Sequence, residues 1–440
     1  MSPTYLDATA NPRAVAPPLR DSITADVCII GGGLTGLSAA LRLAERGARV
    51  VVLEAETIGA GASGRSGGQL IPGFRHGAVA LIARFGEAGA RALIDLTYAA
   101  RERMVATVAA HAIDCDLQLT GHLTAAAFAG DLPDLAAELT AMRRLGLGGQ
   151  TMLDAVGVQQ HVASTAYFGG LHDTAGGHVH PLNYVGGLAA AARAAGVAVY
   201  EHCPALAVDS GVRATVATAD GQVDAVTVVI ACDARVDGVP VRGRPTPGAR
   251  RMMPVWSYSV ATEPLGAQAA ALLPSNAAVS DTRFALDYFR RSADDRLLFS
   301  GGERYTLAPL DDVAGFVRRQ LARAFPALAE VGIDFAWPGT VAVTTSRFPH
   351  VGRDAGLYWA HGYSGHGMLL AQASGHAVAD AIMGDCGAFD ALAALPTRDW
   401  PGGATLRQPL YTAGMAYYGL RDRLRGTRPN RWPAATEGSA

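Results

Sequence analysis

The amino-acid sequence contains no lysine, so all 37 of its basic residues are arginines. A lysine Schiff base and a lysine general base are therefore excluded from any mechanism. Charge is scarce as well, since charged residues make up 17% of the 440-residue chain and the net charge is −2. Without an excess of positive charge, we expect neither a nucleic-acid partner nor binding to an anionic membrane surface.

Long apolar runs and paired cysteines are also missing. No run approaches the ~18 uninterrupted apolar residues of a membrane span, and residues 1–22 lack the apolar core of a signal peptide. The five cysteines form no Cys-x-x-Cys pair, which argues against a disulfide framework and against a zinc site. These absences predict a cytoplasmic protein with no membrane span.

Half of the residues are apolar, and the chain is too long for one ordinary core, so two domains are expected. Residues 25–30 are apolar and β-branched, as in a buried strand, and residues 34–44 place leucines at helical spacing. A second apolar run follows at 49–55. This order predicts a parallel, right-handed, Rossmann-like βαβ unit.

The rest of the chain alternates between helical and strand patterns. Apolar spacing predicts helices at 84–112, 133–147 and 182–196, and Asp311 is the expected N-cap of a further helix. Between residues 252 and 302, short alternating stretches predict antiparallel strands with one buried face. We therefore predict an α/β fold in which a doubly wound domain carries an inserted antiparallel-sheet domain, with the site in the cleft between them.

A glycine motif joins the first strand to the first helix. Gly31, Gly33 and Gly36 are spaced as Gly-x-Gly-x-x-Gly, which allows a tight turn and close approach to a pyrophosphate at the helix N-terminus. Glu54 ends the next strand, where a carboxylate accepts hydrogen bonds from ribose hydroxyls. Dinucleotide binding is favoured over a purely structural turn. An acid at this position disfavours a 2′-phosphate and leaves FAD and NAD.

The sequence "IGAGASGRSGGQL" at residues 58–70 distinguishes between these two cofactors. Its glycines and small residues are also typical of a flexible surface loop. Because this loop follows the second strand, its backbone donors are expected to reach the diphosphate and a ring system beyond it. An NAD enzyme has no evident use for such a loop, so FAD is favoured.

A third glycine-rich segment, "HGYSGHGM" at residues 361–368, precedes a helical pattern. Taken alone, it is most simply a helix start punctuated by glycine, with surface histidines. Together with the other two motifs, it predicts a helix N-terminus whose backbone N–H groups stabilise the negative charge of a reduced flavin. The expected donors are those of Gly365, His366, Gly367 and Met368.

Two other polar segments leave their roles open. His178 and His180 alternate along a predicted strand and point to opposite faces, so we predict no metal site there. One of the two histidines is still able to face the cleft. In "YFRR" at 288–291, Arg290 is either part of a solvated edge or a bidentate ligand for a substrate carboxylate.

The segments "DVCIIGGGLTGLSAALRLAERGARVVVLEA", "IGAGASGRSGGQL" and "GYSGHGM" resemble the FAD-dependent amine and amino-acid oxidases related to glycine oxidase, sarcosine oxidase and D-amino-acid dehydrogenase. Within this group, the chain is most similar to the γ-glutamylputrescine oxidases. The stretches "GGHVHPLN", "LDYFRRSADDRLLFSGG" and "LPTRDWPGGATLRQPLYTAGMAYYGLRDRL" carry that similarity, which extends over nearly the whole chain.

The resemblance implies that a γ-glutamylated primary amine is oxidised to an aldehyde, with ammonia and hydrogen peroxide as products and O2 as electron acceptor. It also implies non-covalent FAD, because no Cys or His follows the family's pattern for covalent attachment. Two departures are visible. Sarcosine-oxidase-like relatives use a lysine to activate oxygen, and this chain has none. Arg347 sits later than the arginine with which relatives bind an α-amino-acid carboxylate.

The resemblance implies a glycine/D-amino-acid-oxidase-like fold with a discontinuous Rossmann-like FAD-binding domain and an inserted antiparallel-sheet substrate domain. We expect a flexible N-terminal arm at residues 1–24. The predicted FAD-binding domain comprises residues 25–100, 155–238 and 340–440, including a C-terminal extension, and the predicted substrate-binding domain comprises residues 101–154 and 239–339.

The expected site residues follow from the motifs and the resemblance. His76, His180 and His366 are candidates to take the proton of the amine, and Tyr288 and Arg290 are expected to orient the γ-glutamyl group. The residues expected to bind FAD are Gly31, Gly33, Leu34, Thr35, Gly36, Glu54, Ala55, Gly61, Ala62, Ser63, Gly64, Arg65, Ser66, Gly67, Gly68, Gln69, Leu70, Ala205, Ala231, Cys232, Arg347, Gly362, Tyr363, Ser364, Gly365, His366, Gly367 and Met368.

Two alternative functions stay open at this point. The first is an FAD-dependent amine or amino-acid dehydrogenase that passes electrons to a quinone or a carrier. The second is a non-catalytic protein that holds FAD as a sensor or structural ligand.

Overall fold

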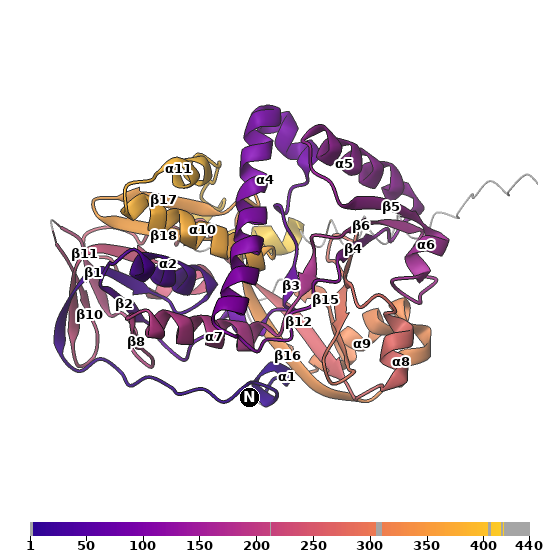
Figure 1. Ribbon diagram of the computed structural model, residues 1–440, viewed down its shortest axis with the longest axis horizontal. Coiled ribbons are helices and arrows are strands. Elements are labelled where there is room, and N and C mark those ends of the chain that lie inside the picture. The colour runs from indigo at the N-terminus through magenta and orange to yellow at the C-terminus, as the bar shows by residue number, and fades with distance from the viewer. Residues whose placement is uncertain (1–2, 212, 305–309, 404–405, 415–416, 418–440) are drawn as a thin grey trace, which may run out of the picture.

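A computed structural model describes residues 3–211, 213–304, 310–403, 406–414 and 417, so the end of the predicted C-terminal extension lies outside the described residues. Two eight-stranded sheets form the two halves of the molecule, and the long helix α4 stands between them (Figure 1). A third, two-stranded sheet joins β3 to β7. The predicted α/β fold with separate parallel and antiparallel parts is thus observed.

The first sheet contains the predicted βαβ unit. Its main path runs β17-β18-β11-β1-β2-β8, and β10 and β9 extend it from β11. From β18 to β8 all neighbouring strands are parallel, so their carboxyl ends lie along one edge. The strands are β1 (Ser22–Ile30), β2 (Val50–Leu53), β8 (Ala198–Tyr200), β9 (Ala207–Asp209), β10 (Ala214–Ala217), β11 (Gln222–Ile230), β17 (His350–Asp354) and β18 (Leu357–His361).

Helices cover only one face of this sheet, which corrects the expected doubly wound arrangement. Val27 and Ile29 of β1 pack in a core with the helices, whereas Cys28 and Ile30 pack against Val208 and the other residues of the β9–β10 side. The short strands β9 and β10 bury this second face together with Val236, Val239 and Val241 of the segment that follows β11. The helices of this half are α2 (Leu34–Glu45), α3 (Ala62–Arg65), α4 (Ala78–Ala110), α7 (Pro181–Ala194), α10 (Gly367–Ile382) and α11 (Gly387–Ala393), with the 3-10 helix η2 (Asp233–Gly238).

The second sheet has the order β16-β12-β15-β14-β13-β4-β6-β5, and only the β13–β4 pair is parallel. Tyr258 and Phe289 bury one face against Val317 and Leu321 of α9. The strands are β4 (His122–Ala125), β5 (Gln150–Asp154), β6 (Gly169–Asp173), β12 (Met253–Thr262), β13 (Ala278–Asp281), β14 (Tyr288–Arg291), β15 (Leu297–Arg304) and β16 (Ile333–Val343). The helices are α5 (Leu132–Arg144), α6 (Ala155–Gln159), α8 (Ala267–Leu272), α9 (Val313–Ala324), η1 (Ala129–Asp131) and η3 (Pro326–Leu328).

Several predicted boundaries differ from the observed ones. β6 pairs within the second sheet, although residues 155–238 were assigned to the FAD-binding domain, because its strand partners β4 and β5 lie there. The N-cap of α9 is Asp312, not Asp311, and its side chain accepts a hydrogen bond from Gly315 N. Helix α4 starts before the predicted helix and breaks at Gly86, whose φ is 70°. The domain limits as a whole stay a prediction.

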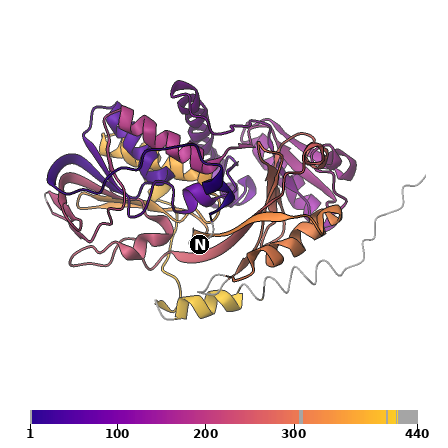
Figure 2. The same cartoon turned by 90° about the horizontal axis from the view of Figure 1, so that it is seen from below.

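The N-terminal segment is packed, contrary to the expected flexible arm. Its short helix α1 (Tyr5–Ala8) opens with a capping box between Thr4 and Asp7. The Tyr5 and Leu6 side chains are buried at 3% and 1% exposure. Helix α1 lies between the two halves of the molecule, beside β16 (Figure 2). The buried Tyr5 and Leu6 side chains and the capping box thus fix the start of the N-terminal segment.

Among the helices that the structure describes, none is both long enough and apolar enough to span a bilayer.

Candidate active site

The predicted binding motifs meet at the carboxyl edge of the first sheet. Gly31 follows β1, Glu54 follows β2, Ala231 follows β11 and Gly362 follows β18, and these strands are adjacent in the sheet. In open parallel sheets, this edge is where ligands bind, because loops and helix N-termini converge there. Segments that lie more than 300 residues apart in the chain are therefore brought together.

The Gly-x-Gly-x-x-Gly turn leaves no room for side chains at two positions. Gly31 has φ of 113°, and a Cβ there would lie 2.6 Å from Ala231 O. A Cβ on Gly36 would overlap Gly31 O. Helix α2 then starts after Gly33, which as the N-cap residue has no side chain to cap the helix. The turn therefore places backbone N–H groups at the sheet edge, as a pyrophosphate site requires.

Glu54 is held at the end of β2 by backbone donors. Its Oε2 accepts a hydrogen bond from Gly32 N at 2.7 Å, and its Oε1 accepts one from Glu56 N at 2.9 Å. This arrangement fixes the carboxylate at the position expected to bind a ribose. Gly32 was not among the predicted residues, although it is the middle glycine of the "GGG" run that opens the motif.

The loop at 58–70 connects the two halves of the molecule. Ser63 Oγ accepts a hydrogen bond from Leu34 N at 3.0 Å, which ties the loop to the start of α2. Further along, Gln69 Nε2 donates to Val279 O and Phe289 O of the second sheet, at 2.9 and 3.1 Å. The loop is thus anchored at both ends and is not a free surface loop.

Residues 361–368 lead into α10 and contact the first glycine motif. The Tyr363 hydroxyl lies 2.7 Å from Thr35 Oγ1 of α2. Gly362 N donates to Asp233 Oδ1 at 2.8 Å. Burial raises the pKa of Asp233 to about 6, although backbone donors oppose the shift. Asp233 was missed, and only its position directly after β11 signalled a role.

One expected donor is not available. His366 N donates to Tyr363 O at 3.0 Å, so this N–H closes a turn instead of pointing to a ligand. Helix α10 begins at the next residue, Gly367, and no side chain caps its N-terminus. The N–H groups of its first turn therefore carry the positive end of the helix dipole.

The residues present fit FAD. Helices α2 and α10 both start at glycine-containing turns on the same sheet edge. The N-cap residue of neither helix makes a side-chain cap hydrogen bond, and at α2 Ser63 Oγ accepts from Leu34 N. A Cβ added at Gly61 or Gly365 would meet no atom within 4 Å, which leaves open space beside both loops. Glu54 would hold the ribose, the α2 turn and the 58–70 loop the diphosphate, and the α10 N-terminus the ring end.

The remaining predicted cofactor residues lie around this edge. Cys232 Sγ lies 3.2 Å from Ile30 O, and burial raises the pKa of its thiol to about 12. Ala205 is buried beyond β8. Arg347 occupies a left-handed turn with φ of 60° after β16. The other predicted residues belong to the turns described above, except Ala55, which is exposed beside Glu54.

His366 differs from the other two candidate histidines in that its Nε2 has no partner in the part of the chain that the structure describes. Its Nε2 is buried and has no hydrogen-bond partner among the described residues. Burial lowers the pKa of His366 to about 4, and the nearby Arg75 adds to the shift. His76 is different, because its Nε2 lies 2.6 Å from Ser346 O and its ring packs on Phe348.

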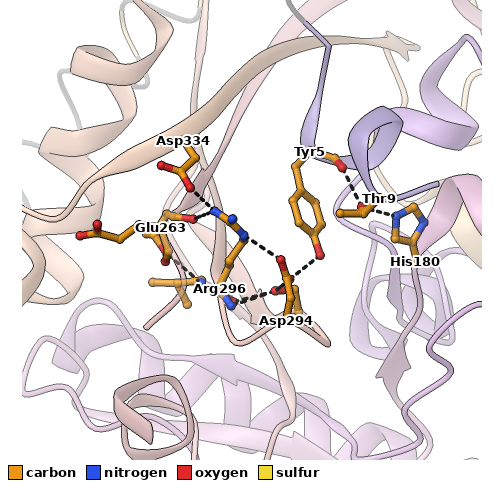
Figure 3. A network of polar contacts seen from close by, with 10 residues as sticks. Tyr5, Thr9, His180, Glu263, Asp294, Arg296 and Asp334 are labelled. Atoms are coloured by element: carbon orange, nitrogen blue, oxygen red, sulfur yellow. Dashed lines mark hydrogen bonds and ion pairs between the residues drawn. The ribbon is translucent and has the colours of Figure 1, made fainter. Parts of the chain in front are cut away.

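His180 does not face the site as a base, which corrects one prediction. Its Nδ1 accepts a hydrogen bond from Asn183 N at 3.1 Å and caps α7. Its Nε2 lies 3.0 Å from Thr9 Oγ1, whose own proton goes to Tyr5 O (Figure 3). Both ring nitrogens are therefore engaged in holding the N-terminal segment against α7.

Tyr288 and Arg290 lie under the 58–70 loop. The Tyr288 ring would be 2.8 Å from a Cβ on Gly67, and its hydroxyl lies 3.3 Å from Ser257 Oγ. Arg290 is 3% exposed, which rules out a solvated edge, and its Nε donates to Gly67 O at 2.6 Å. Its Nη2 has no partner among the described residues, and burial lowers the pKa of Arg290 to about 10.

Comparisons with known proteins agree with this geometry. The family model "FAD dependent oxidoreductase" (DAO) matches residues 26–381. The chain is 41% identical to the γ-glutamylputrescine oxidoreductase of Escherichia coli K12 over 423 residues, which is 96% of this chain and 98% of that protein. It is 37% identical to the probable oxidoreductase OrdL of Haemophilus influenzae, over 93% of this chain and 94% of that protein.

A solved structure supports the fold. The glycine oxidase of Geobacillus kaustophilus superimposes with a TM-score of 0.70 at 23% sequence identity, over 82% of this chain and 95% of the other. Because the family model and the two curated relatives each extend over most of the chain, the protein belongs to the family of FAD-dependent oxidoreductases.

Proposed function

We propose that this protein oxidises the primary amine of a γ-glutamylated diamine, such as γ-glutamylputrescine. The balanced reaction is R–CH2–NH2 + O2 + H2O → R–CHO + NH3 + H2O2. When bound, FAD supplies the two-electron chemistry, and the protein binds and orients the amine. The similarity to the E. coli γ-glutamylputrescine oxidoreductase supports this substrate class.

The observation that carries the proposal is the free Nε2 of His366. An amine with a solution pKa of about 10 arrives as an ammonium ion, which has no lone pair to assist the loss of hydride from its carbon. The lowered pKa of His366 keeps its ring neutral at pH 7, and its unpartnered Nε2 offers a buried acceptor at the start of α10. His366 is therefore proposed to take the ammonium proton, with His76 as a second candidate.

Arg290 and Tyr288 are proposed to hold the other end of the substrate. A buried guanidinium with an unpartnered N–H is costly, and a carboxylate or carbonyl oxygen would satisfy it. Tyr288 is partly exposed beside Gly67 and presents a hydroxyl on the same face of the second sheet as Arg290. Together they suit the charged and polar γ-glutamyl group.

The test is anaerobic reduction of the holoenzyme by the amine. The reduction is measured as the loss of the oxidised-flavin absorbance. We expect γ-glutamylputrescine to bleach the wild-type protein. His366→Asn is expected to slow bleaching by about 100-fold, the typical size of a general-base effect, while flavin content stays unchanged. His111→Asn, at an exposed position, serves as the control. Absence of bleaching by γ-glutamylputrescine would exclude this substrate.

One observation favours a second function, a dehydrogenase that reduces a quinone or a carrier. The chain has no lysine, the residue that sarcosine-oxidase-like relatives use to activate oxygen. Peroxide formed per amine oxidised in air separates the two functions. A ratio near one supports the oxidase, and a ratio near zero with continued turnover on an artificial acceptor supports the dehydrogenase.

A further inference from the structure

A row of hydroxyl groups crosses the second sheet. Thr124 of β4 is paired with Ser280 of β13, and Ser280 is paired with Tyr288 of β14. Tyr288 is in turn paired with Ser300 of β15, and Ser300 with Ser259 of β12. Directly paired residues point to the same face of a sheet. These five residues, the hydroxyl row, therefore project from one face although they lie on five strands.

The hydroxyl row faces the 58–70 loop. Tyr288, in the middle of the row, contacts Gly67, and Arg290 on the same face donates to Gly67 O. The opposite face is apolar, because Phe289 and Phe299 pack into the core beneath α9. The row thus belongs to the side of the sheet on which the candidate site lies.

The two ends of the row differ in how their hydroxyls are satisfied. Ser259 and Ser300 are buried and lie 2.6 Å apart, oxygen to oxygen, so they satisfy each other. At the other end, Thr124 and Ser280 are only half-buried. The Thr124 hydroxyl has no hydrogen-bond partner among the residues that the structure describes. The Thr124 hydroxyl is therefore free to bind a ligand, and Ser280, whose Oγ contacts His122, keeps capacity for a further hydrogen bond.

His122 ties this free end to the proposed catalytic base. Its Nε2 lies 3.0 Å from Ser280 Oγ, and its side chain is buried at 3% exposure. Burial lowers the pKa of His122 to about 3, and His366 is near enough to add to the shift. A neutral His122 thus orients the Ser280 hydroxyl. Sequence analysis missed His122, Thr124 and Ser280, because none belongs to a motif.

We propose that the Thr124 and Ser280 hydroxyls recognise the secondary amide of a γ-glutamylated amine and so select it over the free diamine. This inference rests on the proposed function for its substrate class. A hydroxyl both donates and accepts, so two of them match the N–H and C=O of one amide. Strands lie about 4.8 Å apart, so Thr124 and Tyr288 are separated by about 10 Å, enough for an extended glutamyl group between them.

The first test compares two substrates of the holoenzyme, γ-glutamylputrescine and putrescine, by anaerobic flavin reduction. The specificity ratio is the reduction rate constant divided by the substrate Kd for γ-glutamylputrescine, relative to the same quotient for putrescine. We expect Thr124→Val and Ser280→Ala each to lower this ratio by about threefold to tenfold, the size of one neutral hydrogen bond. Thr124→Ser and Ser280→Thr should keep the ratio. Thr151→Val is the matched control, because Thr151 is exposed and its pairing places it on the other face. An unchanged ratio in both hydroxyl-deleting variants would overturn the inference.

The second test measures binding without turnover, by calorimetry with the n-butylamide of γ-glutamate, which has the amide but no amine to oxidise. We expect Thr124→Val and Ser280→Ala to weaken its binding to the holoenzyme by a similar factor. Lack of binding to the wild type, or equal binding to all variants, would refute amide recognition. If the butylamide binds as expected but γ-glutamylputrescine does not reduce the flavin, the proposed function fails and the inference stands.

Discussion

The carboxyl edge of the first sheet and the hydroxyl row of the second sheet face the same site but are built differently. At the edge, the groups that bind are backbone N–H groups, and side chains are excluded at Gly31 and Gly36. In the row, the groups proposed to bind are the side chains of Thr124, Ser280 and Tyr288, which lie on three neighbouring strands. In this proposal the backbone holds a cofactor that is common to a family, and side chains hold a particular substrate.

This difference has a consequence for mutation. Backbone donors at the edge do not change with the side chain, so most substitutions there act by steric overlap and affect the whole site. Substitutions in the row remove one hydrogen bond at a time and are expected to change selectivity first.

Gly36→Val should nearly abolish flavin binding. Its Cβ would overlap Gly31 O and its branched side chain would force the turn open, which moves the start of α2 away from the diphosphate. We expect flavin content, measured as flavin absorbance per polypeptide, to fall at least about tenfold. Gly130→Ala is the control, since a Cβ there would meet no atom within 4 Å. A Gly36→Val protein with full flavin content would contradict the backbone role of this edge.

Acid should lower the free energy of unfolding through His178, a buried histidine near Arg290. Burial lowers the pKa of His178 to about 3, and the positive charge of Arg290 adds to the shift. The pKa of His178 in the folded state lies below its value of about 6.5 in the unfolded state, so the unfolded state takes up the proton first. The contribution of neutral His178 to the free energy of unfolding is therefore complete above pH 6.5 and is lost as the pH falls. The loss amounts to about 3 kcal/mol between pH 6.5 and 4.

Urea unfolding of the holoenzyme at several pH values measures this loss. His178→Gln should flatten the dependence of the unfolding free energy on pH in that window, and His111→Gln, at an exposed position, should not. If both variants kept the wild-type slope, the buried histidine would not be the cause.

Tyr5→Phe should have the smallest effect, because it removes one hydrogen bond between the N-terminal segment and the second sheet. The Tyr5 hydroxyl donates to Asp294 Oδ1 at 2.7 Å (Figure 3). We expect the free energy of unfolding to fall by about 1 kcal/mol, measured by urea titration. Tyr200→Phe, whose hydroxyl has no protein partner among the described residues, should change it by less than about 0.5 kcal/mol.

The glycine motifs and their helices were readable from the sequence because each is local. Leu34, Leu37 and Leu41 are buried along one side of α2, as their spacing predicts. Gly31 and Glu54 lie at the ends of adjacent strands, as their positions in the βαβ unit require. Such features depend on neighbours within about 25 residues, and local backbone physics is sufficient to place them.

The side-chain chemistry could not be read in the same way. His180 looked like a candidate base, but Thr9 and Asn183 occupy its two nitrogens. Arg290 was compatible with a solvated edge, yet it is buried under Gly67. Each outcome depends on a partner far away in the sequence, and a pattern of residue types does not specify such partners.

The sequence by itself determined the cofactor class and the α/β fold, because glycine spacing, strand ends and helix starts are properties of short stretches of backbone. Only the tertiary structure decided which face of the second sheet carries the hydroxyl row and that, among the described residues, both ring nitrogens of His180 are occupied while Nε2 of His366 is not. It also decided that short strands cover one side of the first sheet where helices were expected. The physical reason is that strand register and burial are set by contacts between distant segments, and these contacts fix both the hydrogen-bond partners and the pKa values of the side chains.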